Sequence, residues 1–86
     1  MRVTVTCFGA MRDYLPPAAH DNRAEVDVAD DATVGAVVEA LGAPRRLVFA
    51  VLVDGTQAGL DAPVHDGADV VLMPPFTGGA RTEGGA

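Results

Sequence analysis

The chain opens with a strict alternation of apolar and polar residues. Segment 2–8 is rich in β-branched residues, and Val3, Val5 and Cys7 fall on one of its two faces. Alternation with a period of two is typical of a half-buried β-strand. Phe8 falls on the opposite face together with two threonines, so the pattern puts an aromatic ring where water is expected.

A second alternating segment, 24–28, predicts another strand with Val26 and Val28 facing inward. Before it, residues 10–15 are expected to form a helical turn, which the two prolines that follow would close. The polar segment 18–23 is expected to be a loop.

One helix is predicted between the second strand and the middle of the chain. Its apolar stripe follows the i, i+3, i+4, i+7 spacing of a helix face and consists of Val34, Val37, Val38 and Leu41. Asp30, Asp31 and Thr33 precede the stripe, and each carries an oxygen able to cap the free N–H groups of a first turn. Gly42 is placed for a left-handed helix stop, and Pro44 prevents continuation.

The second half of the chain predicts three more strands. The unbroken apolar run 47–53 favours a buried central strand, and segment 68–73 is the last strand. A short, weak strand is expected within 56–64. The dipeptides Asp54-Gly55 and Asp66-Gly67 are typical of tight turns, and no other role is expected of them.

This order of elements predicts an α+β fold in a single domain. A mixed sheet of four to five strands would be covered on one face by one main helix. Because the chain crosses over through that helix, the first and last strands are expected to be central neighbours.

The segment after the last strand has the most specific composition in the chain. Pro74 and Pro75 favour an extended arm, because proline fixes its own φ and restricts the residue before it. Gly78 and Gly79 carry no Cβ, so this stretch could enter a channel too narrow for other residues. We therefore expect a domain over residues 1–75 and a flexible tail over 76–86.

Charge and cysteine content narrow the choice of partner. The formal charge is −6, with twelve acidic residues against six arginines, which excludes a nucleic-acid partner and favours one with a basic docking face. The single cysteine forms no internal disulfide, and its spacing from the two histidines fits no metal site. The N-terminus resembles no export signal, so a cytoplasmic protein without a membrane partner is expected.

The remaining polar residues have ordinary structural interpretations. Cys7 is expected to be buried as a small hydrophobe, without thiol chemistry. His20 and His65 are expected in solvent-facing loops. Arg45 and Arg46 are expected at the solvated end of the connection between helix and strand, with contact to a partner as an open alternative.

Four blocks of sequence together resemble the MoaD/ThiS family of sulfur carrier proteins, which have the ubiquitin-like β-grasp fold. The blocks are segments 8–13, 32–35, 53–55 and 65–79. The last block is the most specific, because an Asp-Gly turn, a strand, Pro-Pro and Gly-Gly follow one another in a fixed order. Pro-Pro before Gly-Gly is most similar to the small subunit of molybdopterin synthase.

The resemblance implies a carrier that is not itself an enzyme and binds no cofactor. In this family the terminal glycine is adenylated by an ATP-dependent E1-like activating enzyme and then converted to a thiocarboxylate. The sulfur passes to a substrate in the large subunit of molybdopterin synthase, or in an equivalent sulfur acceptor enzyme. Sulfur transfer for cysteine, thiamine or a secondary metabolite is an open alternative.

Carried onto this chain, the resemblance assigns the thiocarboxylate to Gly79. The tail that inserts into the partner would consist of Pro74, Pro75, Phe76, Thr77 and Gly78. Phe8 and Met73 match the family's apolar docking patch. At position 57, where relatives often have a large apolar residue, this chain has Gln57.

Residues 80–86 depart from the family pattern, because they convert the carboxylate of Gly79 into an amide. We expect a protease to remove them. Loss of Ala86 alone, which would expose Gly85, is a weaker alternative. A third alternative is a ubiquitin-like interaction domain or protein modifier without a carrier role.

Overall fold

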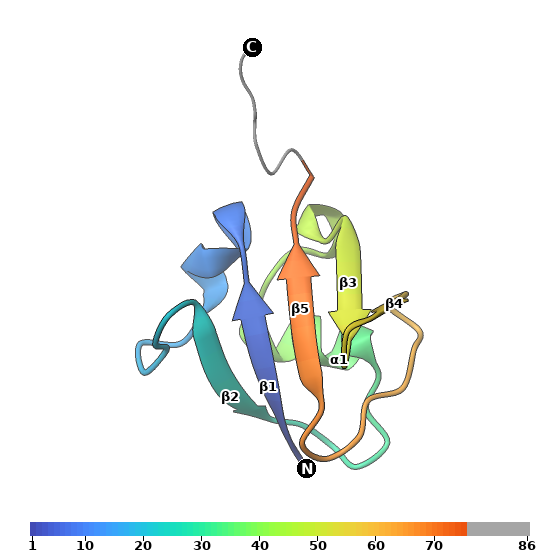
Figure 1. The fold of residues 1–86 in the computed structure, drawn as a ribbon. Helices are drawn as coiled ribbons and strands as arrows, with labels where there is room; N and C mark the ends of the chain where they lie inside the picture. Colours follow the sequence, from blue (N-terminus) through green and yellow to red (C-terminus); the bar gives the residue numbers. More distant parts are fainter. Residues whose placement is uncertain (76–86) are drawn as a thin grey trace.

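The computed structural model describes residues 1–75 and contains one five-stranded sheet with the order β2-β1-β5-β3-β4 (Figure 1). The strands are β1 (Arg2–Cys7), β2 (Arg23–Asp27), β3 (Ala50–Val53), β4 (Thr56–Ala58) and β5 (Asp69–Met73). The main helix is α1 (Val34–Leu41), and two short 3₁₀ helices are η1 (Gly9–Tyr14) and η2 (Arg45–Leu47). The predicted α+β fold is confirmed.

The last strand, β5, occupies the middle of the sheet. It runs parallel to β1 on one side and antiparallel to β3 on the other. The hairpin partners β2 and β4 form the two edges. The prediction that the first and last strands are central neighbours is therefore confirmed.

The core lies between the sheet and α1. Val3, Val5 and Cys7 on β1 are fully buried, as are Val70 and Leu72 on β5. From α1 and its ends the core receives Ala32, Val34, Val37, Val38 and Ala43. The alternation predicted for β1 is confirmed, and the opposite face of the sheet is left without a helix (Figure 1).

The predicted helix is confirmed, but its capping residue is Thr33 alone. Oγ1 of Thr33 accepts a hydrogen bond from the N–H of Ala36, and Gly42 ends the helix in the left-handed conformation at φ 75°. The expectation that Asp30 and Asp31 cap the helix was wrong. Oδ1 of Asp30 lies 3.1 Å from the N-terminal amine of Met1 instead.

The apolar run 47–53 forms a shorter strand than predicted. Only Ala50–Val53 is β3, while Leu47 ends η2 and Phe49 is 77% exposed. The reason lies in β5, whose last paired residue is Met73, opposite Ala50. Pro74 follows and has no N–H group, so the β5–β3 ladder cannot extend to earlier residues of the run.

The two Asp-Gly turns do more than reverse the chain, which corrects the prediction. Oδ1 of Asp54 accepts from the N–H of Asp69 at 3.0 Å, and its second oxygen accepts from Nε2 of His65. Oδ1 of Asp66 accepts from the N–H of Arg2 at 2.9 Å. These bonds staple the turns to the starts of β1 and β5.

Two smaller predictions also need correction. The expected loop 18–23 ends in a tight hairpin turn, in which Asp21 and Asn22 both have positive φ. Strand β2 therefore begins at Arg23, one residue earlier than predicted. Arg45 is exposed as predicted, and its Nη2 lies 3.0 Å from Oε2 of Glu39 on α1.

Candidate functional site

The candidate site is the end of the sheet where the chain leaves β5, which we call the tail end. Because β1 is parallel to β5 and β3 antiparallel, the end of β1 and the start of β3 lie at this same end. Helices η1 and η2, which adjoin those strand ends, therefore flank the exit of the chain (Figure 1).

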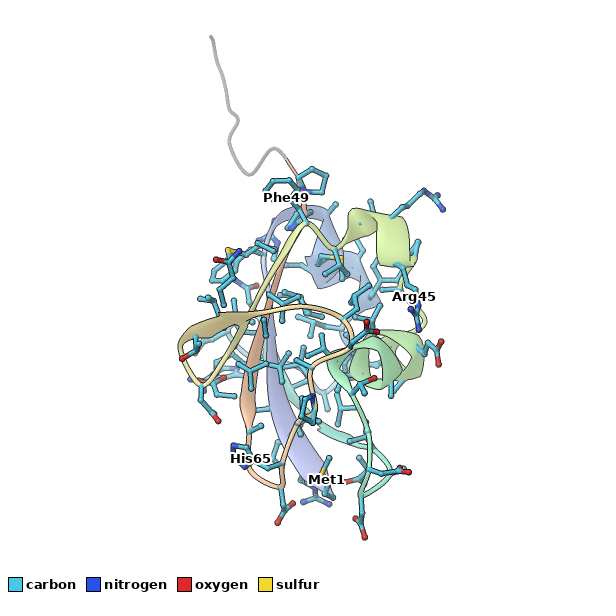
Figure 2. The ribbon with its side chains drawn as sticks, turned by 90° about the vertical axis from the view of Figure 1, so that its right-hand side faces the viewer. Met1, Arg45, Phe49 and His65 are labelled. Carbon is cyan, nitrogen blue, oxygen red and sulfur yellow. The ribbon has the colours of Figure 1, made fainter. Side chains whose placement is uncertain are left out.

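Two exposed aromatic side chains lie on either side of this exit. Phe8 is 43% exposed and Phe49 is 77% exposed, and they are the large exposed hydrophobic residues of the described chain. The N–H of Phe8 donates to the carbonyl of Leu72 at 3.2 Å, and the N–H of Phe49 donates to the carbonyl of Met73 at 2.8 Å. The backbone of β5 thus holds the backbone of both residues beside the exit, and Figure 2 shows Phe49 at this end of the molecule.

Gly9 lies against Pro74, the first residue after β5, and we call this contact the seat of Pro74. The φ of Gly9 is +57°, and a Cβ added there would lie 2.9 Å from Cγ of Pro74. Pro74 itself is buried. Glycine is required on both counts, because L residues adopt this φ only with strain and the ring of Pro74 occupies the space of a side chain. The direction in which the chain leaves the domain is therefore set inside the domain.

The open face of the sheet carries a half-buried apolar patch next to the exit. The register pairs Val71 with Leu52, and Met73 with Ala50. Extending the β1–β5 register by one residue brings Phe8 beside Met73. We call Phe8, Met73, Val71 and Leu52 the open-face patch. Gln57, directly opposite Leu52, gives it a polar border.

The structure brings together Phe8 and Met73, the two residues predicted to dock a partner. Pro74 and Pro75 follow at the exit, where the side chain of Pro74 packs within the domain. Phe76, Thr77, Gly78 and Gly79 lie outside the described residues, so their roles in insertion and thiocarboxylation remain predictions.

Sequence reasoning missed Phe49 and the contribution of Val71 and Leu52. Val71 could have been found, because period-two alternation places it on the same face as Met73. Leu52 follows once the pairing of β3 with β5 is known. Phe49 gave no such signal, since it stands within an apolar run that predicted burial.

No catalytic group is apparent at the tail end within residues 1–75. Burial raises the pKa of the Cys7 thiol to about 11, so it is protonated at neutral pH and the expected inert role is supported. The described part of the chain holds no cluster of three potential metal ligands. A surface hollow of about 500 Å³ lies over β1 and β2, and neither Phe8 nor Phe49 lines it.

Within the described residues no helix has the length and apolar character needed to cross a membrane.

Comparison with known proteins gives a family match over most of the chain. Residues 1–78 match the model of the family described as Mut7-C ubiquitin. No curated protein matches the sequence.

Solved structures give the same fold. The chain is similar to small archaeal modifier protein 1 (SAMP1) from Haloferax volcanii, with 28% identity, a TM-score of 0.65, and coverage of 92% of this chain and 100% of that one. A second structure of that protein gives 28% identity and a TM-score of 0.64 over 87% and 98% of the two chains.

A protein described as molybdopterin converting factor, subunit 1, from Pyrococcus furiosus has 19% identity and a TM-score of 0.63, over 87% and 98% of the two chains. This likeness concerns the fold. Together with the family match, these structures confirm the ubiquitin-like β-grasp predicted from the sequence.

Proposed function

Because this chain belongs to the Mut7-C ubiquitin family, we propose that it is a carrier protein that presents Gly79 to other enzymes. It would act after a protease has cut between Gly79 and Ala80. An E1-like enzyme would then activate the new carboxylate, and an acceptor enzyme would take the sulfur loaded onto it.

The observation that carries this proposal is the seat of Pro74 against Gly9. A carrier must aim its terminus, because the reacting atom has to arrive in a defined direction in the partner's active site. Gly79 follows Pro75 by four residues. Fully extended, those residues would carry it at most about 14 Å beyond the exit.

The chemistry requires no catalytic side chain from the carrier. The Gly79 carboxylate attacks the α-phosphorus of ATP, releasing pyrophosphate and forming an acyl adenylate. A sulfur nucleophile, supplied as a persulfide by a partner, then displaces AMP, and reduction of the remaining S–S bond by a thiol leaves a thiocarboxylate. Side chains that move protons in these steps belong to the partners.

Within this class, the favoured role is the small subunit of molybdopterin synthase, which donates sulfur when a dithiolene is built. The support is the order Pro74, Pro75, Gly78, Gly79 on a β-grasp domain with an apolar open-face patch. Sulfur delivery for cysteine, thiamine or secondary metabolites uses the same activated terminus.

A second candidate is covalent protein modification. It is favoured by the 28% identity to a protein named as a small archaeal modifier. A modifier would share the adenylation step, after which a lysine amine of a target protein would displace AMP and form an amide with Gly79.

Intact-mass spectrometry of chains with defined ends tests the carrier function. A chain of residues 1–79, incubated with an E1-like activating enzyme, ATP and a sulfur donor, should gain about sixteen mass units as sulfur replaces one oxygen. A chain of residues 1–85 is the matched control, because it also ends in Gly-Gly but lacks the nearby prolines.

The full chain and the 1–85 control should show no gain. If the 1–79 chain also keeps its mass while its activating enzyme is demonstrably active on another carrier, the carrier proposal fails. Amide conjugates of the 1–79 chain to lysines, without a thiocarboxylate, would establish the modifier function instead.

A further inference from the structure

Arginines are distributed unevenly between the two ends of the sheet. Arg2, at the end opposite the exit, pairs with Asp27 at 3.0 Å and lies 3.6 Å from Glu25. Arg45 pairs with Glu39. Among residues 1–75, no carboxylate lies within 4.0 Å of the guanidinium of Arg12, Arg23 or Arg46. All three belong to tail-end segments, namely η1, the start of β2 and η2.

Acidic residues are concentrated at the opposite end, which we call the far end. Strand directions place there the end of β2, the connection to α1, the β3–β4 turn and the start of β5. These segments carry Asp27, Asp30, Asp31, Asp54, Asp66 and Asp69. The tail end also holds two aspartates, Asp13 in η1 and Asp21 in the turn before β2, beside its three arginines. Most of the negative charge of the described chain therefore lies at the far end.

The distance between the two ends of the sheet determines which charges act on a partner bound at the tail end. Strand β5 has five residues and separates the two ends by about 16 Å, at about 3.3 Å per residue. The Debye length at physiological ionic strength is about 8 Å. The far-end aspartates lie about two Debye lengths from the tail end, so their charges are largely screened there. Arg12 and Arg46, by contrast, belong to the two 3₁₀ helices that flank the exit.

We propose that Phe8, Phe49, Arg12 and Arg46 form a docking surface for a partner whose tail-accepting mouth is apolar and rimmed by carboxylates. The two aromatic rings flank the exit, and buried aromatics and arginines are the residue types that dominate binding energy at interfaces. Nε of Arg12 donates to the carbonyl of Gly9 at 3.3 Å, which holds this guanidinium beside the seat of Pro74.

This proposal differs from the expectation of a partner with a basic docking face, which was based on net charge alone. It rests on the proposed function only in taking the tail end as the docking end, and its test needs no chemistry at Gly79. A basic partner would meet Arg12 and Arg46 beside the exit, and like charges across an interface oppose binding.

Two short peptides provide a defined probe. Both contain Leu-Phe-Leu, one flanked on each side by two glutamates and the other by two lysines. Amide chemical shifts of the isotope-labelled full chain are followed by NMR as each peptide is added. The glutamate peptide should shift amides of η1, η2, Phe8 and Phe49, whereas the lysine peptide should shift amides at the far end.

Charge reversal separates local charge from net charge. Arg46→Glu should weaken binding of the glutamate peptide at least fivefold, whereas Asp31→Lys, an equal and opposite change at the far end, should alter it less than twofold. Arg46 and Asp31 are both exposed, and the spectra report whether each variant stays folded.

Comparable effects of both substitutions would overturn the proposal, as would tail-end shifts with the lysine peptide or none there with the glutamate peptide. These results are independent of the mass measurement. A chain that gains no sulfur but binds the glutamate peptide at the tail end would retain the surface and lose the carrier function.

Discussion

The tail end and the far end of the sheet are held in different ways. At the far end, polar side chains bond to backbone groups: Asp66 to the N–H of Arg2, Asp54 to that of Asp69, and Asp30 to the N-terminal amine. Figure 2 shows Met1 and His65 there, opposite Phe49. At the tail end, backbone hydrogen bonds and the Gly9–Pro74 contact hold the chain, while Phe8 and Phe49 face solvent.

This difference indicates that the two ends of the sheet have different roles: the far end stabilises the fold, and the tail end binds partners. At the far end, polar side chains form hydrogen bonds with the backbone of the domain itself, so few of them remain available to bind a partner. The tail end exposes the aromatic rings of Phe8 and Phe49, as an interaction surface requires. Substitutions at the two ends should therefore fail in different ways.

The largest effect on stability is expected from filling the seat of Pro74. Gly9→Ala should lower the free energy of unfolding by about 2–3 kcal/mol, from backbone strain at positive φ together with the clash. Gly67→Ala at the far end should cost only about 1 kcal/mol, because its φ is also positive but open space surrounds it. Urea unfolding of both variants measures the difference.

Removing the proline ring tests the cause of that difference. In a Pro74→Ala background, Gly9→Ala should cost about as much as Gly67→Ala, near 1 kcal/mol. If the excess cost persists without the ring, the seat does not explain the need for glycine.

A charge on the open-face patch should affect binding more than folding. Phe8→Asp is expected to weaken association with an activating enzyme by at least ~2 kcal/mol, because a carboxylate would be buried against an apolar face. Circular dichroism should show a folded domain, since Phe8 is already 43% exposed. Ala29→Asp puts the same carboxylate at the far end and should leave binding unchanged. A folded Phe8→Asp variant that binds at full strength would remove Phe8 from the docking surface.

The start of α1 provides a far-end test that should change stability alone. Thr33→Ala removes the hydroxyl that caps the helix and should cost about 1 kcal/mol, whereas Thr33→Ser should cost little. Thermal unfolding measures both. Sulfur loading of the Thr33→Ala variant of the 1–79 chain should equal that of the parent 1–79 chain. A loss of loading at temperatures where the domain is folded would contradict the division between the ends.

The smallest effect is expected from pH, and only at the far end. Hydrogen bonds from His65 to Asp54 and to the carbonyl of Asp66 raise the pKa of His65. The pKa of Asp54 is lowered by the N–H of Asp69 and then by His65. The stabilisation from His65 is complete below its ordinary pKa near 6.5 and is lost as pH rises through the raised value, whereas that from Asp54 is lost as pH falls through a value below 3.8.

The pair therefore contributes most between about pH 4 and 6.5. His65→Gln should reduce stability in this window and converge with the parent chain at higher pH. NMR titration should show the pKa of His65 falling towards its ordinary value in Asp54→Asn. Amides of Phe8 and Phe49 should not follow this titration; if they do, the two ends are coupled.

Most of this fold was predicted by local sequence patterns that are compatible with only one type of secondary structure. The alternation of β1, the stripe of α1 and the Thr33 and Gly42 boundaries each satisfied local rules and were confirmed. Predictions were wrong where the structure of one segment depends on a second segment of the same chain. The length of β3 depends on Pro74 in another strand, and the roles of Asp54 and Asp66 depend on which N–H groups the fold brings to them.

The same holds for the candidate site. Phe8 and Met73 were found because the family resemblance supplied them, and the register then places them together. Phe49 and Arg12 were missed, since exposure and charge separation are properties of the assembled sheet. Net charge suggested a basic partner, and it carries no information on the position of the charges.

Because β5 lies in the centre of the sheet, the complete sheet can form only after β5 has been synthesised. Before residue 69 is made, the nascent chain can form only the β1–β2 and β3–β4 hairpins, and isolated hairpins of this size are marginally stable in water. Closing the sheet needs contacts across almost the whole chain, which makes folding slow relative to a helical protein of this length. A prematurely terminated copy stays unfolded and open to degradation. Every folded copy therefore already includes the strand from which the tail departs.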